Sequence, residues 1–251
     1  MERKSEGILV TLENTIPEFY RDLTADNSLK GLWHFTHRRS ESDPKKPART
    51  ENGLPHQVAL DWKEIFPEHQ GKIEIEIGSG RGAFLAEYGN RHPESFILGS
   101  EWDYTWAAFA MRKILKNTLG NTAMLRGDIF YFLRDRVPDS SVDAFHMYFP
   151  DPWPKERHHK NRLLRPEFLK EVARTLKPGK RNFYWGTDHK EYNEWALEYF
   201  DAFPGCVVTQ RNVAEPTEGI MTGFEVKYRK EGRPKPIEKY LGSGYKVLSS
   251  K

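Results

Sequence analysis

The chain has one cysteine, Cys206, among its 251 residues, so it cannot form an internal disulfide bond. A lone cysteine is typical of proteins that work in a reducing compartment. No apolar run approaches the roughly 20 residues of a membrane-spanning helix, and residues 1–20 lack the apolar core of a signal peptide. These absences predict a soluble cytoplasmic protein that does not enter a membrane.

A strong excess of charge is also missing. The 39 lysines and arginines against 36 aspartates and glutamates give a formal net charge of +3. Any affinity for nucleic acid must therefore come from local basic patches. Aromatic residues make up 13% of the chain, which argues against disorder throughout.

The composition changes near residue 55. Residues 1–55 are mainly polar, and residues 40–53 hold the prolines and charges typical of a linker or mobile arm. Arg38 and Arg39 could touch phosphate, although a solvated tail explains them equally well. We predict a polar, partly flexible extension over residues 1–55 and a folded domain over residues 56–251.

Strands and helices alternate in the folded domain. The pattern predicts strands at residues 73–77, 96–99, 123–125, 142–149 and 182–185, and helices at 83–91, 103–117, 129–134, 166–176 and 192–203. Val207-Val208 and Phe224–Tyr228 are predicted to form a closing antiparallel pair. Such alternation indicates an α/β fold with a mostly parallel sheet between helices. Ligands of such sheets bind at the carboxyl ends of the strands.

Acidic residues lie at or just past five predicted strand ends, namely Glu76, Glu101, Asp128, Asp151 and Asp188. The carboxyl ends of parallel strands share one edge of the sheet, so these side chains are expected to gather there. Each also has a structural interpretation when taken alone; Asp128, for example, suits the N-cap of the helix that follows it.

A glycine loop, Gly78-Ser79-Gly80-Arg81-Gly82, follows the first strand and lets a ligand approach the backbone closely. A dinucleotide-binding loop has its third glycine one residue later, and Glu76 would repel a pyrophosphate. A carboxylate here suits a cationic ligand such as S-adenosylmethionine, which carries an ammonium and a sulfonium group. Glu101 would then accept hydrogen bonds from the ribose hydroxyls, and Asp128 would lie near the adenine.

A second distinctive segment, Phe149-Pro150-Asp151-Pro152-Trp153-Pro154, follows the strand at 142–149. Its three prolines cannot continue a helix or a central strand, so they predict a stiff corner that carries Asp151. Cationic residues come next, at Lys155, Arg157, Lys160, Arg162 and Arg165. This combination suggests a site for an anionic polymer with flat bases, although a solvated loop explains it as well. The adjacent His158 and His159 lack the spacing of zinc ligands, and we predict no metal site.

In order along the chain, these segments resemble the tRNA (guanine-N7)-methyltransferases of the TrmB type. The resemblance spans about residues 70–235. The matching segments are Glu76-Ile77-Gly78-Ser79-Gly80-Arg81-Gly82, Phe149-Pro150-Asp151-Pro152-Trp153-Pro154-Lys155, Arg157-His158-His159-Lys160, Pro166-Glu167-Phe168-Leu169, Gly186-Thr187-Asp188 and Thr222-Gly223-Phe224-Glu225. Many methyltransferases share the glycine loop, whereas the proline-rich segment with its basic continuation is specific.

The resemblance implies a Rossmann-like methyltransferase fold over residues 56–251, S-adenosylmethionine as cofactor, and methylation of guanine N7 in the variable loop of tRNA. It implies that the donor is bound by Glu76, Gly78, Gly80, Glu101, Asp128 and Asp151, with Asp151 also the catalytic residue. It implies guanine or tRNA contacts from Lys155, Asp188, Thr222, Gly223, Phe224 and Glu225. We expect Arg157, Lys160 and Arg162 to contact RNA phosphates.

Other functions stay open at this point. A methyltransferase for another RNA or a small molecule would share the fold, although a small-molecule enzyme would not need the basic segment. A non-catalytic RNA-binding module would not need the acids at the strand ends, and a nicotinamide oxidoreductase would need the missing glycine spacing. The sequence does not decide between a monomer and a homodimer, or whether a second subunit is needed.

Overall fold

The computed structural model describes residues 23–25, 29, 31–35, 59–178, 182–203, 206–213, 219–232 and 245–250. Its strands are β1 (Leu23–Ala25), β2 (Leu32–Phe35), β3 (Lys72–Ile77), β4 (Ser95–Glu101), β5 (Thr122–Gly127), β6 (Ala144–Tyr148), β7 (Asn182–Gly186), β8 (Cys206–Val213) and β9 (Tyr245–Ser250). Its helices are α1 (Trp62–Ile65), α2 (Ala83–Arg91), α3 (Tyr104–Lys116), α4 (Ile129–Arg136), the 3-10 helix η1 (Glu156–Asn161), α5 (Pro166–Thr175), α6 (Lys190–Ala202) and α7 (Gly223–Lys230).

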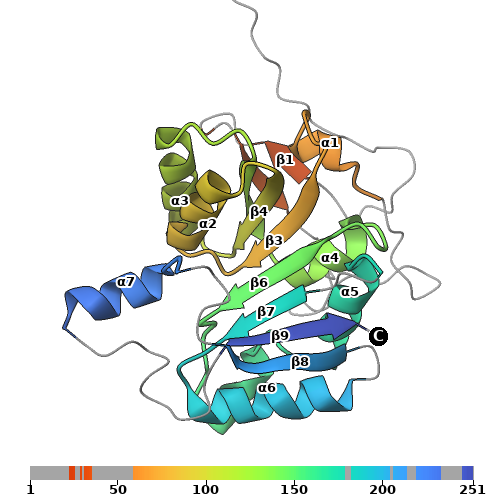
Figure 1. The fold of residues 1–251 in the computed structure, drawn as a ribbon, viewed down its shortest axis with the longest axis vertical. Coiled ribbons are helices and arrows are strands. Elements are labelled where there is room, and N and C mark those ends of the chain that lie inside the picture. The colour runs from red at the N-terminus through yellow and green to blue at the C-terminus, as the bar shows by residue number, and fades with distance from the viewer. Residues whose placement is uncertain are drawn as a thin grey trace, which may run out of the picture.

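The described strands form one sheet in the order β1-β2-β5-β4-β3-β6-β7-β9-β8 (Figure 1). Strands β2, β5, β4, β3, β6 and β7 run parallel, β1 is antiparallel to β2, and β9 is antiparallel to β7 and β8. The order reverses at β3, which has β4 on one side and β6 on the other. A reversal of this kind leaves a crevice at the carboxyl ends of the strands, where ligands bind.

Central strands of the sheet bury both of their faces. Ile73, Ile75 and Ile77 of β3 pack in a core with residues of α4, α5 and α6, whereas Glu74 and Glu76 alternate with them. An alternating strand normally leaves its polar face in water. Here α2 and α3 cover that side with a second core, so both carboxyl groups are buried.

One segment of the predicted closing antiparallel pair is not a strand. Val207 and Val208 lie in β8, but their partners are Ser249 and Leu248 of β9. Phe224–Tyr228 lies in helix α7, which begins at a capping box formed by Thr222 and Glu225. The capping box satisfies the first N–H groups of the segment, which favours a helix over the predicted strand.

Part of the predicted N-terminal extension belongs to the sheet. Residues 32–35 form β2 and pair in parallel register with residues 124–127 of β5. Leu32 and Phe35 are buried, so the prediction that this stretch is irregular is wrong for these residues. Arg38, Arg39 and the predicted linker at 40–53 lie outside the described residues, and the domain boundary near residue 55 remains a prediction.

Within the described ranges, no helix has both the length and the apolarity needed to cross a membrane. The same residues contain no group of three or more His, Cys, Asp or Glu side chains arranged to hold a metal ion.

Candidate active site

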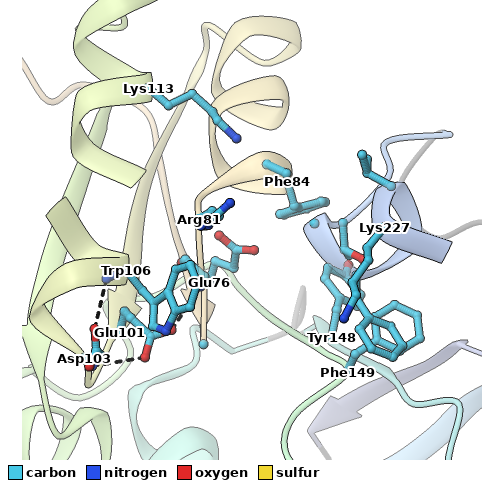
Figure 2. Close-up of a pocket in the computed structure, with 18 of the residues that line it drawn as sticks. Glu76, Arg81, Phe84, Glu101, Asp103, Trp106, Lys113, Tyr148, Phe149 and Lys227 are labelled. Carbon is cyan, nitrogen blue, oxygen red and sulfur yellow. Dashed lines mark hydrogen bonds between the residues drawn. The ribbon is translucent and has the colours of Figure 1, made fainter. Parts of the chain in front are cut away.

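A pocket of about 1270 Å³ opens at the carboxyl edge of the sheet, where β3 ends (Figure 2). Its walls come from four parts of the fold: the glycine loop after β3, the end of β4 with the start of α3, the corner after β6, and helix α7. The predicted site residues that line it are Glu76, Gly78, Gly80, Glu101, Asp151, Thr222, Gly223 and Phe224. The sheet reversal and the pocket therefore coincide.

The glycine loop leaves its backbone open to the pocket. Gly78 and Gly80 have φ angles of 74° and 52°, and a Cβ atom at either position would meet nothing within 4 Å. Gly82 has another role, because a Cβ atom there would come within 2.7 Å of the Ala110 Cβ on α3. The first two glycines thus expose backbone to a ligand, and the third allows α2 to pack against α3.

Glu101 ties the glycine loop to the end of β4. Its Oε2 accepts a hydrogen bond from the Gly80 N–H at 3.0 Å, and its Oε1 accepts from Trp102 N at 2.8 Å and Asp103 N at 3.2 Å. The carboxylate also lines the pocket. It is therefore held in place beside a ligand, while its contact with a ribose remains a prediction.

Glu76 lies at the floor of the pocket, between the α3 wall and the wall formed by Tyr148 and Lys227 (Figure 2). The residue is only 4% exposed, and its Oε2 has no hydrogen-bond partner among the described residues. Burial, aided by the nearby Glu101 carboxylate, raises the pKa of Glu76 to about 7. A buried carboxyl oxygen left without a partner suits a ligand that brings positive charge.

Glu74, two residues earlier on the same face of β3, is fully partnered. Its Oε2 accepts a hydrogen bond from the Tyr88 hydroxyl at 2.8 Å and lies 2.8 Å from His146 Nε2. The Nδ1 of His146 lies 3.0 Å from the Tyr148 hydroxyl. Burial alone would raise the pKa of Glu74, but the hydrogen bond and charge of His146 and the bond from Tyr88 lower it to about 2. Glu74 therefore stabilises the fold, and Glu76 is the carboxyl group available to a ligand.

The proline-rich corner places Asp151 at the pocket, where its side chain is exposed. Phe149 and Trp153 have positive φ angles of 50° and 46°, which are unfavourable for aromatic residues. The Phe149 N–H donates to the Gly186 carbonyl at 2.7 Å, and its ring lies 5.2 Å from the ring of Phe224. Strained backbone held by such contacts is typical of functional sites.

The prediction that Arg162 contacts phosphate is wrong, because its side chain is 0% exposed. Its Nε donates to the Pro152 carbonyl at 2.8 Å, and its Nη1 donates to Glu191 Oε1 at 2.9 Å. A second bond joins its Nη2 to Glu191 Oε2. Its guanidinium carbon lies 4.6 Å from the ring centroids of Tyr192 and Trp195. A planar guanidinium can make all these contacts at once, and sequence cannot distinguish it from its exposed neighbours.

Arg162 fixes two predicted site segments relative to each other. Pro152 follows Asp151 directly, and Glu191 lies in the first turn of α6, three residues after Asp188. Asp188 in turn accepts a hydrogen bond from the Tyr228 hydroxyl of α7 at 3.3 Å. The corner, the turn after β7 and helix α7 are therefore linked by buried or half-buried polar contacts.

The other predicted contacts are placed as follows. Lys155, Arg157 and Lys160 are exposed at and within η1, so they are accessible to a polyanion, and their phosphate contacts remain predictions. Glu225 Oε2 accepts from the Thr222 N–H at 2.8 Å, so both residues cap α7, and their guanine contacts also remain predictions.

Asp128 is the N-cap of α4, as predicted, because its Oδ1 accepts a hydrogen bond from Phe130 N at 3.0 Å. Burial raises its pKa. The residues that line the pocket do not include Asp128, and its place near an adenine remains a prediction.

Several lining residues were missed by the sequence reasoning, among them Arg81, Phe84, Trp102, Trp106, Lys113 and Tyr148. A signal existed for Trp102, which lies between the strand-end acid Glu101 and the N-cap Asp103, and for Trp106, which lies in the first turn of the helix that Asp103 caps. Lys227 reaches the pocket from α7.

This chain is similar to known proteins. A family model described as "Putative methyltransferase" matches residues 70–236. The tRNA (guanine-N(7)-)-methyltransferase of Caulobacter sp. (strain K31) is 34% identical over 203 residues, which cover 75% of this chain and 87% of the relative. The enzyme of the same name from Alkalilimnicola ehrlichii is 37% identical over 180 residues, which cover 71% and 75%.

A solved structure of the 16S rRNA methyltransferase KamB matches with a TM-score of 0.51 and 17% identity, over 77% of this chain and 94% of that chain. This similarity shows a shared fold. The predicted Rossmann-like methyltransferase fold is thereby confirmed, and the fold and pocket define the chain as an α/β methyltransferase. The chain belongs to the tRNA (guanine-N7)-methyltransferase family of the TrmB type.

Glu76→Gln should bind S-adenosylmethionine roughly ten- to a hundredfold more weakly at about pH 8, because a charge-assisted hydrogen bond contributes about 1.5–3 kcal/mol. With a pKa near 7, the wild-type affinity should fall as the pH drops from about 8 to about 6, because the carboxyl group becomes protonated. The variant should show no such pH dependence. Calorimetry at both pH values measures this, with the exposed Glu68→Gln as control.

The unliganded protein offers an independent readout. The folded-state pKa of Glu76 lies above its ordinary value, so the stabilising effect of the neutral form is lost as the pH rises through about 7. Thermal melts should show this loss in wild type and a smaller loss in Glu76→Gln. Equal donor affinities for the two proteins at every pH would contradict the placement of Glu76.

Arg162→Lys should lower the free energy of unfolding by roughly 2–4 kcal/mol, because lysine cannot replace the paired bonds to Glu191 and leaves a buried charge poorly paired. Arg157→Lys, at an exposed position, is the matched control and should leave stability unchanged. Urea unfolding measures both. An Arg162→Ala variant of normal stability that binds tRNA with a reduced salt dependence would restore the phosphate-contact interpretation.

Proposed function

We propose that this protein transfers the methyl group of S-adenosylmethionine to N7 of a guanine in tRNA. One observation carries the proposal: the buried Glu76, whose Oε2 has no hydrogen-bond partner among the described residues, and the exposed Asp151 line the same pocket. The first suits a cationic methyl donor, and the second lies in the segment most specific to the family. The relatives named above carry this activity in their names.

The residues present fit the donor. Gly78 and Gly80 leave backbone exposed at the pocket, so an amino acid moiety can approach closely. Glu76 would accept hydrogen bonds from the donor ammonium group and would lose its proton on binding, because a positive neighbour lowers the pKa of a carboxyl group. Glu101 would hold the ribose hydroxyls. When bound, S-adenosylmethionine supplies a methyl group attached to positively charged sulfur.

Methyl transfer to guanine N7 depends mainly on how the base is positioned. Guanine N7 has a free lone pair, so no base is needed to make it a nucleophile, and alignment of N7 with the methyl group supplies much of the rate. Positive charge moves onto the purine during transfer. A carboxylate at Asp151 or Asp188 would accept the Watson–Crick N–H groups of guanine, select guanine over adenine and stabilise that charge.

The tRNA would lie along the exposed basic side chains of the corner. Lys155, Arg157 and Lys160 follow Asp151 within nine residues, and all three are exposed. Their attraction to phosphate positions the substrate without reading its sequence. The target guanine would be unstacked to reach the pocket, as is usual for RNA bases recognised by proteins. The variable loop is the site that the family resemblance implies.

A tRNA transcript made with 7-deazaguanosine tests the reacting atom. This analogue replaces N7 by a C–H group, so it keeps the Watson–Crick edge but has no lone pair to accept the methyl group. Labelled S-adenosylmethionine should methylate the normal transcript and leave the analogue unlabelled. Equal labelling of both transcripts would place the methyl group on another atom.

Asp151→Asn should lower the rate of single-turnover methylation by roughly a hundredfold, because it removes one preorganised charge from the site of the developing cation. Binding of tRNA should change little, since the basic side chains remain. The exposed Asp201→Asn on α6, outside the pocket lining, is the matched control. The rate is measured at saturating donor and tRNA, beside a thermal melt.

A near-normal rate for Asp151→Asn would end its catalytic assignment. A lower melting temperature with a normal rate would instead make Asp151 a structural residue of the corner.

A further inference from the structure

Helix α3 exposes a row of aromatic rings to solvent. Tyr104, Trp106 and Phe109 are 46%, 40% and 42% exposed, and we call these three residues the α3 aromatic face. The buried side of the same helix packs through Ala107, Met111 and other residues against the sheet. The solvent side of such a helix is normally polar, so rings there call for a ligand or partner.

Cationic side chains accompany these rings. The Arg81 guanidinium carbon lies 4.6 Å from the ring centroid of Trp106 and 5.1 Å from that of Phe109. The Arg112 guanidinium carbon lies 5.9 Å from the Phe109 centroid. Residues 104–116 also include Lys113 and Lys116 and contain no aspartate or glutamate. Residues 104–116 therefore combine flat apolar rings with positive charge, and the acid beside them is the N-cap Asp103.

The α3 aromatic face is continuous with the donor pocket. Trp106 and Arg81 line the pocket and lie side by side at its edge (Figure 2). Tyr104 and Phe109 are not among the lining residues, so they extend the surface beyond the donor site. Tyr104 is further supported by the ring of His34 at the end of β2, stacked at 5.8 Å with an interplanar angle of 18°.

We propose that the α3 aromatic face is a stacking platform for an unpaired nucleotide of the RNA substrate, next to the base that enters the pocket. This rests on the proposed function, which brings RNA to the pocket edge. Aromatic rings with nearby cations bind single-stranded nucleic acid because every base offers a flat face and every nucleotide a phosphate. Arg81 and Arg112 would pair with the phosphates, and Phe109 would stack on a base.

The positive charge beside the α3 aromatic face favours RNA over a second copy of the chain as its partner. A two-fold interface through this face would bring Arg81, Arg112, Lys113 and Lys116 of one copy close to the same residues of the other. Like charges brought together in this way oppose association. A polyanion meets the same side chains with complementary charge.

Phe109→Ala is the informative variant, because Phe109 is exposed and lies outside the donor pocket. Phe109→Tyr keeps a ring and serves as the rescue variant. Thr105→Ala, an exposed change on the same helix, is the matched control. Two probes are used with each protein: a fluorescein-labelled tRNA transcript and a labelled single-stranded RNA oligonucleotide of mixed sequence. Binding is followed by anisotropy, donor affinity by calorimetry and association state by sedimentation.

Phe109→Ala should weaken binding of both RNAs about tenfold, within the range found for loss of one stacked base. Its log–log dependence on salt should match wild type, because no charge is lost. Arg112→Ala should instead lower that slope by about 0.7. Phe109→Tyr and Thr105→Ala should bind RNA as wild type does, and donor affinity should not change.

Three results would overturn the proposal. Unchanged RNA binding by Phe109→Ala overturns the proposal. A shift from dimer to monomer would assign the face to self-association, and weaker donor binding would assign it to the donor site; either overturns the proposal. If wild type fails to methylate tRNA while RNA binding still depends on Phe109, the proposed function fails and the stacking platform stands.

Discussion

Burial of the Glu76 carboxyl group at the end of β3 is the constraint on which the site depends. A carboxylate removed from water without a partner is costly, and the pKa near 7 shows how strongly burial disfavours its charge. The sheet reversal, the glycine loop and α3 place that group at the floor of an open pocket. A bound cationic ligand would offset the desolvation cost of the Glu76 carboxylate, so ligand binding and ionisation of Glu76 are linked.

The acceptor side of the pocket follows a different principle. Methyl transfer to a lone pair needs alignment more than acid–base chemistry, and the corner after β6 is built for rigidity. Proline rings, two aromatic residues with positive φ angles and the Arg162 contacts all restrict its motion. The ion pair between the buried Arg162 and the exposed Glu191 carries this restriction to the turn that holds Asp188. The two acids that would face guanine are thus fixed by one arginine.

Sequence patterns predicted most of the fold because they report local physics. The helix at 83–91 has the predicted bounds, and Asp128 caps the next helix but one as its position suggested. The family motifs also located the pocket walls formed by the glycine loop and the corner. The strand predicted at Phe224–Tyr228 was wrong because local capping chemistry favours a helix there.

The features that the sequence could not show depend on contacts between residues that are far apart in the chain. Glu74 and Glu76 look alike in an alternating strand. Contacts from Tyr88 and from His146, 72 residues away, are what make Glu74 a structural carboxylate. Arg162 resembles its basic neighbours until Glu191 reaches it from α6. The exposure of the α3 rings could not be predicted, because exposure depends on what the rest of the fold leaves uncovered.

The most direct measurement is nucleoside analysis of bulk tRNA after incubation with the protein and S-adenosylmethionine labelled in its methyl group. Digested tRNA is separated and its nucleosides are identified by mass spectrometry. The account predicts that the label appears in 7-methylguanosine and depends on both Glu76 and Asp151. Label in another nucleoside, or no transfer by a folded protein that binds both donor and tRNA, would contradict it.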